Sequence, residues 1–207
     1  ELVATPESGY QFVSYSCGTW SATTDIANFT MPPGAAELVV TFEDAPIQTR
    51  NFRAQRATDG TWYTLTAELL GEGTYCNVFV EQGSGVTQTQ AEAVAAEFDD
   101  NIFEEITTNF GAHGDVDDDD KVTLLLLDII DGYDPVVGSY VAGYFDPAHM
   151  ADSAVNSNSN ECDMIFIDIY PGDLEDDAFY TTIAHEFQHL INYSRTVMED
   201  GREQDLW

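Results

Sequence analysis

Short hydrophobic runs separated by turn-forming residues dominate the first 82 positions. The runs AELVVTF and CNVFV are rich in β-branched and aromatic residues, and Asp59-Gly60 lies between two extended segments, as a two-residue hairpin turn would. The pattern predicts a small antiparallel β-module over residues 1–82, and the sequence QGSG at 82–85 is the predicted linker. We find no catalytic constellation in this module, so we expect it to have a structural or pro-region-like role.

The hydrophobic period changes after residue 86. A long amphipathic helix is predicted because apolar residues recur every four positions on one face and a glycine follows where a C-terminal cap belongs: Val94, Phe98, Ile102, Ile106, Phe110 and then Gly111. The runs VTLLLLDII and DMIFIDIY are short and bounded by acidic or turn residues, as buried strands are. The chain therefore reads as an α+β protein, with the β-module followed by a mixed sheet and helices over residues 86–207.

A second predicted helix follows the second buried strand and contains an H-E-x-x-H pattern. His185 and His189 are four residues apart, so they lie about 40° apart around the helix axis and roughly 6 Å along it. Two imidazoles placed in this way can bind one Zn²⁺ ion. Glu186 is turned about 100° from His185, so it can reach a zinc-activated water as the general base without binding the metal.

The five-residue pattern also occurs in helices as ordinary surface or core histidines. Three features favour a catalytic zinc site here: the helical setting, the packed neighbours Ala184 and Phe187, and a strand immediately upstream. We therefore predict that His185 and His189 bind zinc and that Glu186 is catalytic.

The charge balance is strongly acidic, with 38 Asp and Glu against 6 Lys and Arg and a formal net charge of -32. Such a field repels phosphate backbones, so we expect no nucleic-acid partner. No run is long and apolar enough to predict a membrane span. The excess acid indicates either a solvated shell, suited to salt-rich surroundings, or bound cations.

One acidic stretch, GDVDDDDKV, resembles a calcium loop. Asp115, Asp117 and Asp119 alternate as the first, third and fifth ligands of such a loop do, but Asp120 replaces its turn glycine and Leu126 its bidentate glutamate. The stretch is therefore no EF-hand. It is either a solvated acidic turn before a strand or a Ca²⁺ site completed by distant oxygens.

Three cysteines leave one unpaired in any disulfide scheme. A bridge between Cys17 and Cys76 would close a loop of about 60 residues and stabilise an exported protein by about 4 kcal/mol. The alternative is three reduced cysteines in a cytosolic protein.

Several motifs together resemble the hyicolysin and pallilysin-like family of secreted bacterial zinc endopeptidases, which are gluzincins. They are AHEFQHLINY, preceded by GDVDDDDKVTLLLLDI, GYF and SNSNECDMIFIDIY, and the resemblance covers roughly residues 75–207. It implies a thermolysin-like half-domain, secretion, and peptide substrates bound along an edge strand. It also implies a third zinc ligand, a glutamate on the next helix.

The expected position of that glutamate is just beyond Trp207, on a segment absent from this sequence. Glu199 and Glu203 are the less favoured alternatives, because they lie in a polar stretch typical of a loop. The catalytic subdomain at 86–207 is thus predicted to be truncated or nicked, and a nicked chain would keep a docked C-terminal remainder. The competing interpretation is a calcium-dependent binding or adhesion module with an inert peptidase site.

Overall fold

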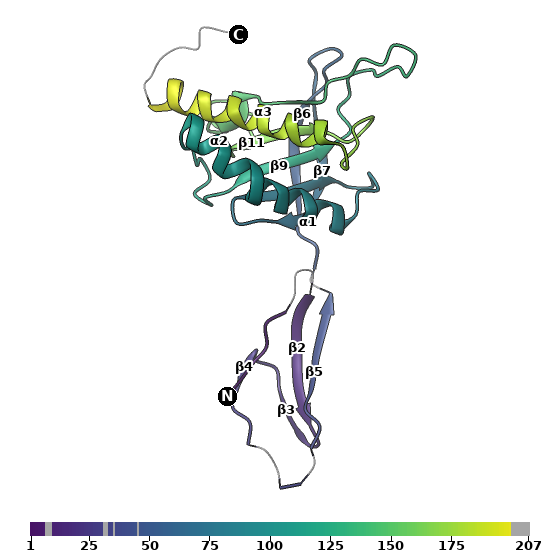
Figure 1. Ribbon diagram of the computed structural model, residues 1–207, viewed down its shortest axis with the longest axis vertical. Helices are drawn as coiled ribbons and strands as arrows, with labels where there is room; N and C mark the ends of the chain where they lie inside the picture. The colour runs from purple at the N-terminus through teal and green to yellow at the C-terminus, as the bar shows by residue number, and fades with distance from the viewer. Residues whose placement is uncertain (7–9, 31–32, 35, 45, 200–207) are drawn as a thin grey trace. The chain divides into compact units, whose positions relative to one another are not determined.

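The computed structural model describes residues 1–6, 10–30, 33–34, 36–44 and 46–199 (Figure 1). The chain divides into two compact units, Glu1–Ile47 and Gln48–Trp207. Each unit is described by itself.

Unit 1 is an antiparallel β structure. A two-stranded ladder pairs β1 (Leu2–Val3) with β4 (Ile26–Ala27), and a three-stranded sheet has the order β3 (Trp20–Ala22), β2 (Tyr10–Cys17), β5 (Val39–Asp44). Tyr15 of β2 is buried, and its hydroxyl donates a hydrogen bond to the Asp25 carbonyl at 2.8 Å. The antiparallel strands predicted for the start of the chain are confirmed.

Unit 2 is built on a six-stranded mixed sheet. In spatial order its strands are β10 (Gly143–Tyr144), β11 (Met164–Asp168), β9 (Val122–Leu127), β8 (Cys76–Glu81), β7 (Trp62–Glu72) and β6 (Thr49–Gln55). The three central strands β11, β9 and β8 are parallel, and β6, β7 and β10 are antiparallel to their neighbours. The edge strand β10 is therefore free of a strand partner on its outer side among the described residues.

The division between units differs from the boundary expected at residues 82–86. Strands β6, β7 and β8 belong to the same sheet as β9, because β8 pairs in parallel with β9 from Cys76↔Val122 to Val80↔Leu126. Alternating hydrophobicity identified these strands but carries no information about their partners. The hairpin between β6 and β7 is present, but residues 56–61 form its loop in place of a two-residue turn.

The predicted long helix is continuous but changes its winding. It runs as α1 (Gln88–Glu97), a π-helical segment (Phe98–Ile102) and α2 (Phe103–Phe110), and Gly111 caps it with φ 103°. Residues four apart drift about 40° per step on an α-helix, and a wider π turn opposes that drift. Val94, Phe98 and Ile102 accordingly all stay buried.

The remaining helices follow the strands. A 3₁₀ turn, Pro147–Met150, precedes β11, and α3 (Asp177–Tyr193) continues as a π-helical segment, Ser194–Glu199. Figure 1 shows α1, α2 and α3 together on one face of the sheet. Among the described residues, no helix has both the length and the apolar character needed to cross a bilayer.

Both faces of the sheet are covered. Leu124 and Leu126 of β9 pack into the cluster that includes the helices, whereas Leu125 and Leu127 pack into a second cluster on the opposite face. Every residue of β9 and β11 is therefore buried, as in parallel strands covered on both sides. The two short apolar runs were correctly predicted as buried strands.

The predicted disulfide is absent, since Cys17, Cys76 and Cys162 are all free thiols. Cys76 is fully buried in the core of unit 2, beneath α1, whereas Cys17 belongs to unit 1. Burial raises the pKa of the Cys76 thiol to about 12. The Cys76 thiol is thus enclosed by its own unit.

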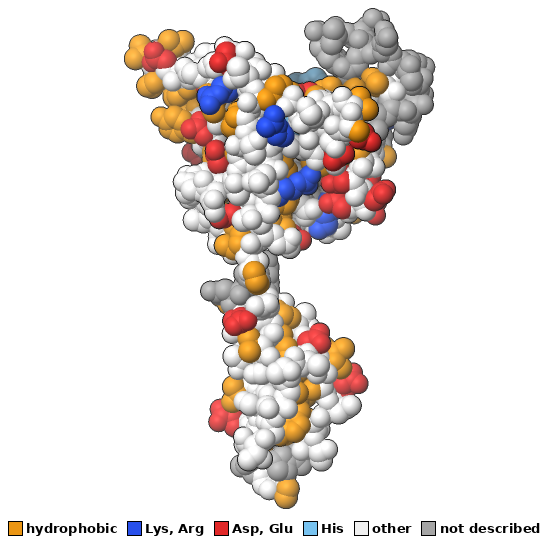
Figure 2. Space-filling model, turned by 180° about the vertical axis from the view of Figure 1, so that it is seen from behind, with side chains coloured by type: hydrophobic (Ala, Val, Ile, Leu, Met, Phe, Trp, Pro, Cys, Tyr) orange, Lys and Arg blue, Asp and Glu red, His pale blue; other side chains and the backbone are white. Residues whose placement is uncertain are grey.

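Basic side chains hold one loop to the sheet. Arg50 and Arg53 lie on β6 and donate hydrogen bonds of 2.6 Å to the Asn160 carbonyl and to Asn158 Oδ1. Figure 2 shows basic side chains in a row across this side of unit 2, with acidic side chains to either side. These arginines fasten the loop before β11.

Candidate functional site

Helix α3 begins with a capped turn after β11. Asp176 is its N-cap, and the Asp176 Oδ1 atom accepts a hydrogen bond from the Ala178 amide at 3.0 Å. Phe179, Ile183, Phe187, Leu190 and Ile191 form its buried face. This packing fixes the helix against β11 and leaves the opposite side for the predicted ligands.

The two histidines of α3 converge. Their Nε2 atoms are 3.0 Å apart, and their ring planes are nearly perpendicular. Two nitrogens that bind one tetrahedral zinc at about 2.0–2.1 Å lie about 3.4 Å from each other. His185 is exposed and His189 is half-buried, so the shared point is reachable from solvent. The pair fits one zinc ion with little adjustment.

Glu186 lies beside this pair in a drier environment. It is 8% exposed, and burial raises the pKa of its carboxyl. The neighbouring His185 and His189 and the Phe145 amide oppose the rise in the Glu186 pKa but only in part. The side chain therefore faces both the histidines and the segment that contains β10.

The edge strand runs close to α3 at this point. A Cβ added to Gly143 would lie 2.8 Å from Thr182 Cγ2 and 2.9 Å from the Phe166 carbonyl oxygen. Thr182 lies one turn before Glu186 on α3. The absence of a side chain at Gly143 therefore lets β10 pack closely against α3. The outer edge of the sheet then lies alongside the H-E-x-x-H residues.

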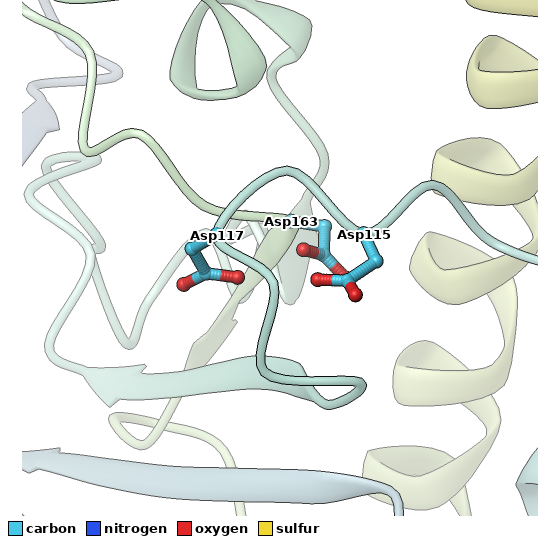
Figure 3. A group of neighbouring side chains, drawn as sticks. All are labelled: Asp115, Asp117 and Asp163. Atoms are coloured by element: carbon cyan, nitrogen blue, oxygen red, sulfur yellow. The ribbon is translucent and has the colours of Figure 1, made fainter.

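A separate acidic group lies before β9. Asp115, Asp117 and Asp163 each offer an oxygen within 4.8 Å of the other two. Figure 3 shows Asp163 between the two loop aspartates.

Asp119, which the sequence pattern included, does not belong to this group, because its carboxylate accepts hydrogen bonds from the Lys121 amide and Asn77 Nδ2. Asp163 takes its place because the parallel pairing of β11 with β9 brings it beside the loop.

The charges of this acidic group are only partly compensated. His113 Nδ1 lies 3.0 Å from Asp163 Oδ2. Burial lowers the pKa of His113, but the hydrogen bond and charge of Asp163 outweigh it and leave that pKa raised. Burial, together with the negative charges of Asp119 and Asp163, raises the pKa of Asp117 to about 6. A cation bound here would relieve that repulsion.

The structure also places a further histidine and the last strand residue of β10. His149 is fully buried, because its ring packs against Trp62 and Phe166 and its Nδ1 atom contacts Asn160 Nδ2 at 2.9 Å. Tyr144 stacks on Phe166. The third-ligand positions are not tested: Glu203 and Trp207 lie outside the described residues, as does the side chain of Glu199.

Part of this chain is similar to a metalloprotease. Over 149 residues it is 34% identical to the neutral metalloprotease ShpI of Staphylococcus hyicus, a match that covers 68% of this chain. The chain spans about a third, 33%, of the length of that curated relative. The similarity relates this chain to metallopeptidases without fixing the subfamily, and the activity of the whole protein is a matter of inference.

A second similarity concerns unit 1. The family model described as the divergent InlB B-repeat domain matches residues 1–46. That range nearly coincides with unit 1, Glu1–Ile47. The amino-terminal unit is therefore similar to that repeat domain.

Two acidic residues of interest escaped the sequence analysis. Asp163 and Asp168 stand at the two ends of β11, and both are almost completely buried. A charged residue at each end of an apolar run was the available signal, but it equally describes ordinary strand termini. The three-dimensional structure is needed to show that Asp163 lies beside the loop before β9 and that Asp168 accepts a hydrogen bond from the Ile129 amide at 2.8 Å.

Proposed function

We propose that unit 2 carries the zinc-binding and catalytic residues of a secreted zinc-dependent endopeptidase. The observation that carries the proposal is the convergence of His185 Nε2 and His189 Nε2 to 3.0 Å, with the buried Glu186 beside them. The similarity to a neutral metalloprotease supports the same reaction class. A zincin-like half-domain of the gluzincin type is the architecture that this proposal favours.

His185 and His189 would hold the zinc ion, and Glu186 would remain outside its ligand set. When bound, zinc supplies a Lewis acid that polarises a carbonyl and lowers the pKa of a water molecule. The Glu186 carboxylate would take a proton from the attacking water and return it to the leaving nitrogen. The Phe145 backbone amide donates a hydrogen bond to this carboxylate.

The edge strand gives the substrate a place to lie. In the described part of the chain β10 has one strand partner, β11, and its outer edge offers backbone amides and carbonyls to an extended peptide. Because Gly143 packs on α3 next to Thr182, a peptide added there would pass Glu186. The third zinc ligand is proposed to be a glutamate beyond Trp207, which a docked C-terminal remainder would supply in a nicked protein.

The full-length protein gives the direct test. Casein hydrolysis should require about one bound zinc per chain, be lost with a zinc-selective chelator, and return when zinc is restored. Hydrolysis that survives complete zinc removal would contradict the proposal.

A second candidate function is a calcium-dependent binding or adhesion module with an inert or incomplete peptidase site. The group of Asp115, Asp117 and Asp163 favours it, together with the repeat-domain similarity of unit 1. Metal analysis separates the two candidates: the module should retain calcium and no stoichiometric zinc, and it should not cleave casein.

A further inference from the structure

A small acidic cavity lies one helical turn from the proposed catalytic residues. Its volume is about 170 Å³, and it is enclosed by the carboxyl end of β11, the segment before β10 and the first turns of α3. Ala142 and Thr182 belong to its wall, so it opens beside the same stretch of β10 and α3 that borders Glu186. A volume below the roughly 300–1,000 Å³ of drug-sized sites suits one side chain.

Three aspartates belong to the lining of this cavity: Asp168, Asp173 and Asp176. None of the described residues in its lining is a lysine, arginine or histidine. Asp173 and Asp176 are exposed, whereas Asp168 is 1% exposed, so Asp168 marks the inner end and the other two mark the mouth.

Asp168 has an unsatisfied oxygen. Its Oδ1 atom accepts the Ile129 amide at 2.8 Å, but its buried Oδ2 atom has no hydrogen-bond partner. A buried carboxylate oxygen without a partner is costly, and a charged donor that reaches it would remove that cost. Burial also raises the pKa of Asp168 to about 7, although the hydrogen bonds from the Ile129 and Tyr170 amides lower it.

A metal ion does not suit these carboxylates. Among the described residues, the acidic groups whose ligand atoms come within 4.8 Å of one another comprise Asp115, Asp117 and Asp163, and none of the three in the cavity. A side chain with several donors can bridge more widely separated oxygens. Guanidinium presents five N–H donors in a planar fork, and its aliphatic stem could pack on Tyr140 and Phe179 in the cavity wall.

We propose that this cavity is a substrate subsite for a basic side chain, with arginine favoured over lysine. The inference rests on the proposed peptidase function, because it names the side chain preferred beside that site. Asp168 meets the guanidinium at the inner end, and Asp173 and Asp176 attract it at the mouth.

The test uses the full-length protein and fluorogenic peptides in which arginine is exchanged for citrulline, its neutral isostere, at each position around the cleaved bond. At one position arginine should raise kcat/KM over citrulline by about tenfold or more, as a buried charge pair does. Lysine should fall between them. The ratio of the two kcat/KM values is the readout, because any loss common to both substrates cancels.

The variants are Asp168→Asn and the pair Asp173→Asn with Asp176→Asn, alone and combined. Asparagine keeps the acceptor oxygens that receive the Ile129, Glu175 and Ala178 amides. The arginine-to-citrulline ratio of kcat/KM should fall toward one in the combined variant.

The matched control is Asp152→Asn, since Asp152 Oδ1 accepts the Ala154 amide in a similar turn outside the cavity. The arginine-to-citrulline ratio of this control should stay unchanged. The single exchanges at the mouth keep the test valid if Asp168→Asn impairs folding.

Binding separates failure of the subsite from failure of the peptidase proposal. Labelled arginine and citrulline peptides are titrated into the Glu186→Gln protein by fluorescence anisotropy. If no peptide is cleaved by the unmodified protein but arginine still binds more tightly, and the aspartate variants remove that difference, the subsite stands and the peptidase proposal fails. Cleavage without an arginine preference at any position, or a preference that survives the combined variant, overturns the subsite.

Discussion

Two side chains of unit 2 show how a residue's surroundings set its chemistry. Glu186 and Asp168 are both buried acids, and burial raises the pKa of each. Glu186 has two histidines beside it, whereas Asp168 has backbone amides and an oxygen without a partner. The surroundings of Glu186 suit a base beside a metal ion, and those of Asp168 suit a carboxylate that pairs with a cationic group.

Replacing Glu186 separates catalysis from metal binding. Glu186→Gln should keep about one zinc per chain and lower kcat by about 10²- to 10⁴-fold or more, since the amide cannot take a proton. Glu104→Gln is the control, because Glu104 is exposed on α2, and its kcat should be unchanged. Zinc analysis and peptide hydrolysis on the same samples provide the measurement. Loss of zinc from Glu186→Gln would show that the residue is a ligand.

The histidines should behave differently from Glu186. His185→Ala or His189→Ala should remove both zinc and hydrolysis, because each takes away half of the proposed ligand pair. Metal content after dialysis against buffer with trace zinc measures this. Stoichiometric zinc retained in either variant would place the metal elsewhere.

Asp168 should make stability depend on pH. Its folded pKa of about 7 lies above the unfolded value of about 3.9, so folding favours the protonated carboxyl. The contribution of Asp168 to the free energy of unfolding is fully present below pH about 4 and declines as the pH rises toward 7. Asp168→Asn should therefore gain thermal stability relative to the unmodified protein by a few degrees at pH 8 and by less at pH 5. An equal difference at both pH values would refute the shift.

At the scale of elements, the contact between α3 and β10 holds the site together. Gly143 permits it, because a side chain there would press on Thr182 Cγ2 and the Phe166 carbonyl. The helix supplies Glu186 and the histidines, and the strand supplies the open edge.

Adding one methyl group at this contact is informative. Gly143→Ala should destabilise unit 2 by about 1–3 kcal/mol, because the packed backbone cannot yield easily. The companion variant Gly143→Ala with Thr182→Ser removes one of the two clashing atoms and should recover part of the loss. Thermal unfolding measures both. Full stability in Gly143→Ala alone would show that the strand can move away from the helix.

Local sequence patterns predicted the individual helices and strands better than they predicted which strands pair with one another. The runs that became β9 and β11, the helix that ends at Gly111 and the convergence of His185 with His189 depend on spacing within one segment. The membership of β6 to β8 in the central sheet depends on parallel pairing with β9, which spacing does not encode. The same pairing brought Asp163 into the acidic group in place of Asp119.

For the whole molecule, a net charge of -32 makes ionic conditions part of stability. Like charges oppose compaction, and any salt relieves them by screening. A specific cation site would add a contribution that screening cannot supply. In unit 2 the candidate for such a site is the group of Asp115, Asp117 and Asp163, whose carboxylate oxygens lie within 4.8 Å of one another. Burial and neighbouring charges raise the pKa of Asp117 in this group to about 6.

Calcium and sodium chloride should therefore differ at equal ionic strength. After chelation, calcium at about 100 times its Kd should stabilise the folded chain by about 2.7 kcal/mol, which raises Tm by roughly 5–10 °C for a protein of this size. Sodium chloride should restore less. Asp115→Asn with Asp117→Asn should remove the calcium-specific part of the Tm shift and keep the response to sodium chloride.

The control is Asp118→Asn, which removes one negative charge at an exposed neighbour outside the group. Asp118 has a left-handed backbone conformation that asparagine tolerates, so this variant should keep the calcium response. Equal recovery with both salts would show that screening alone stabilises this acidic chain.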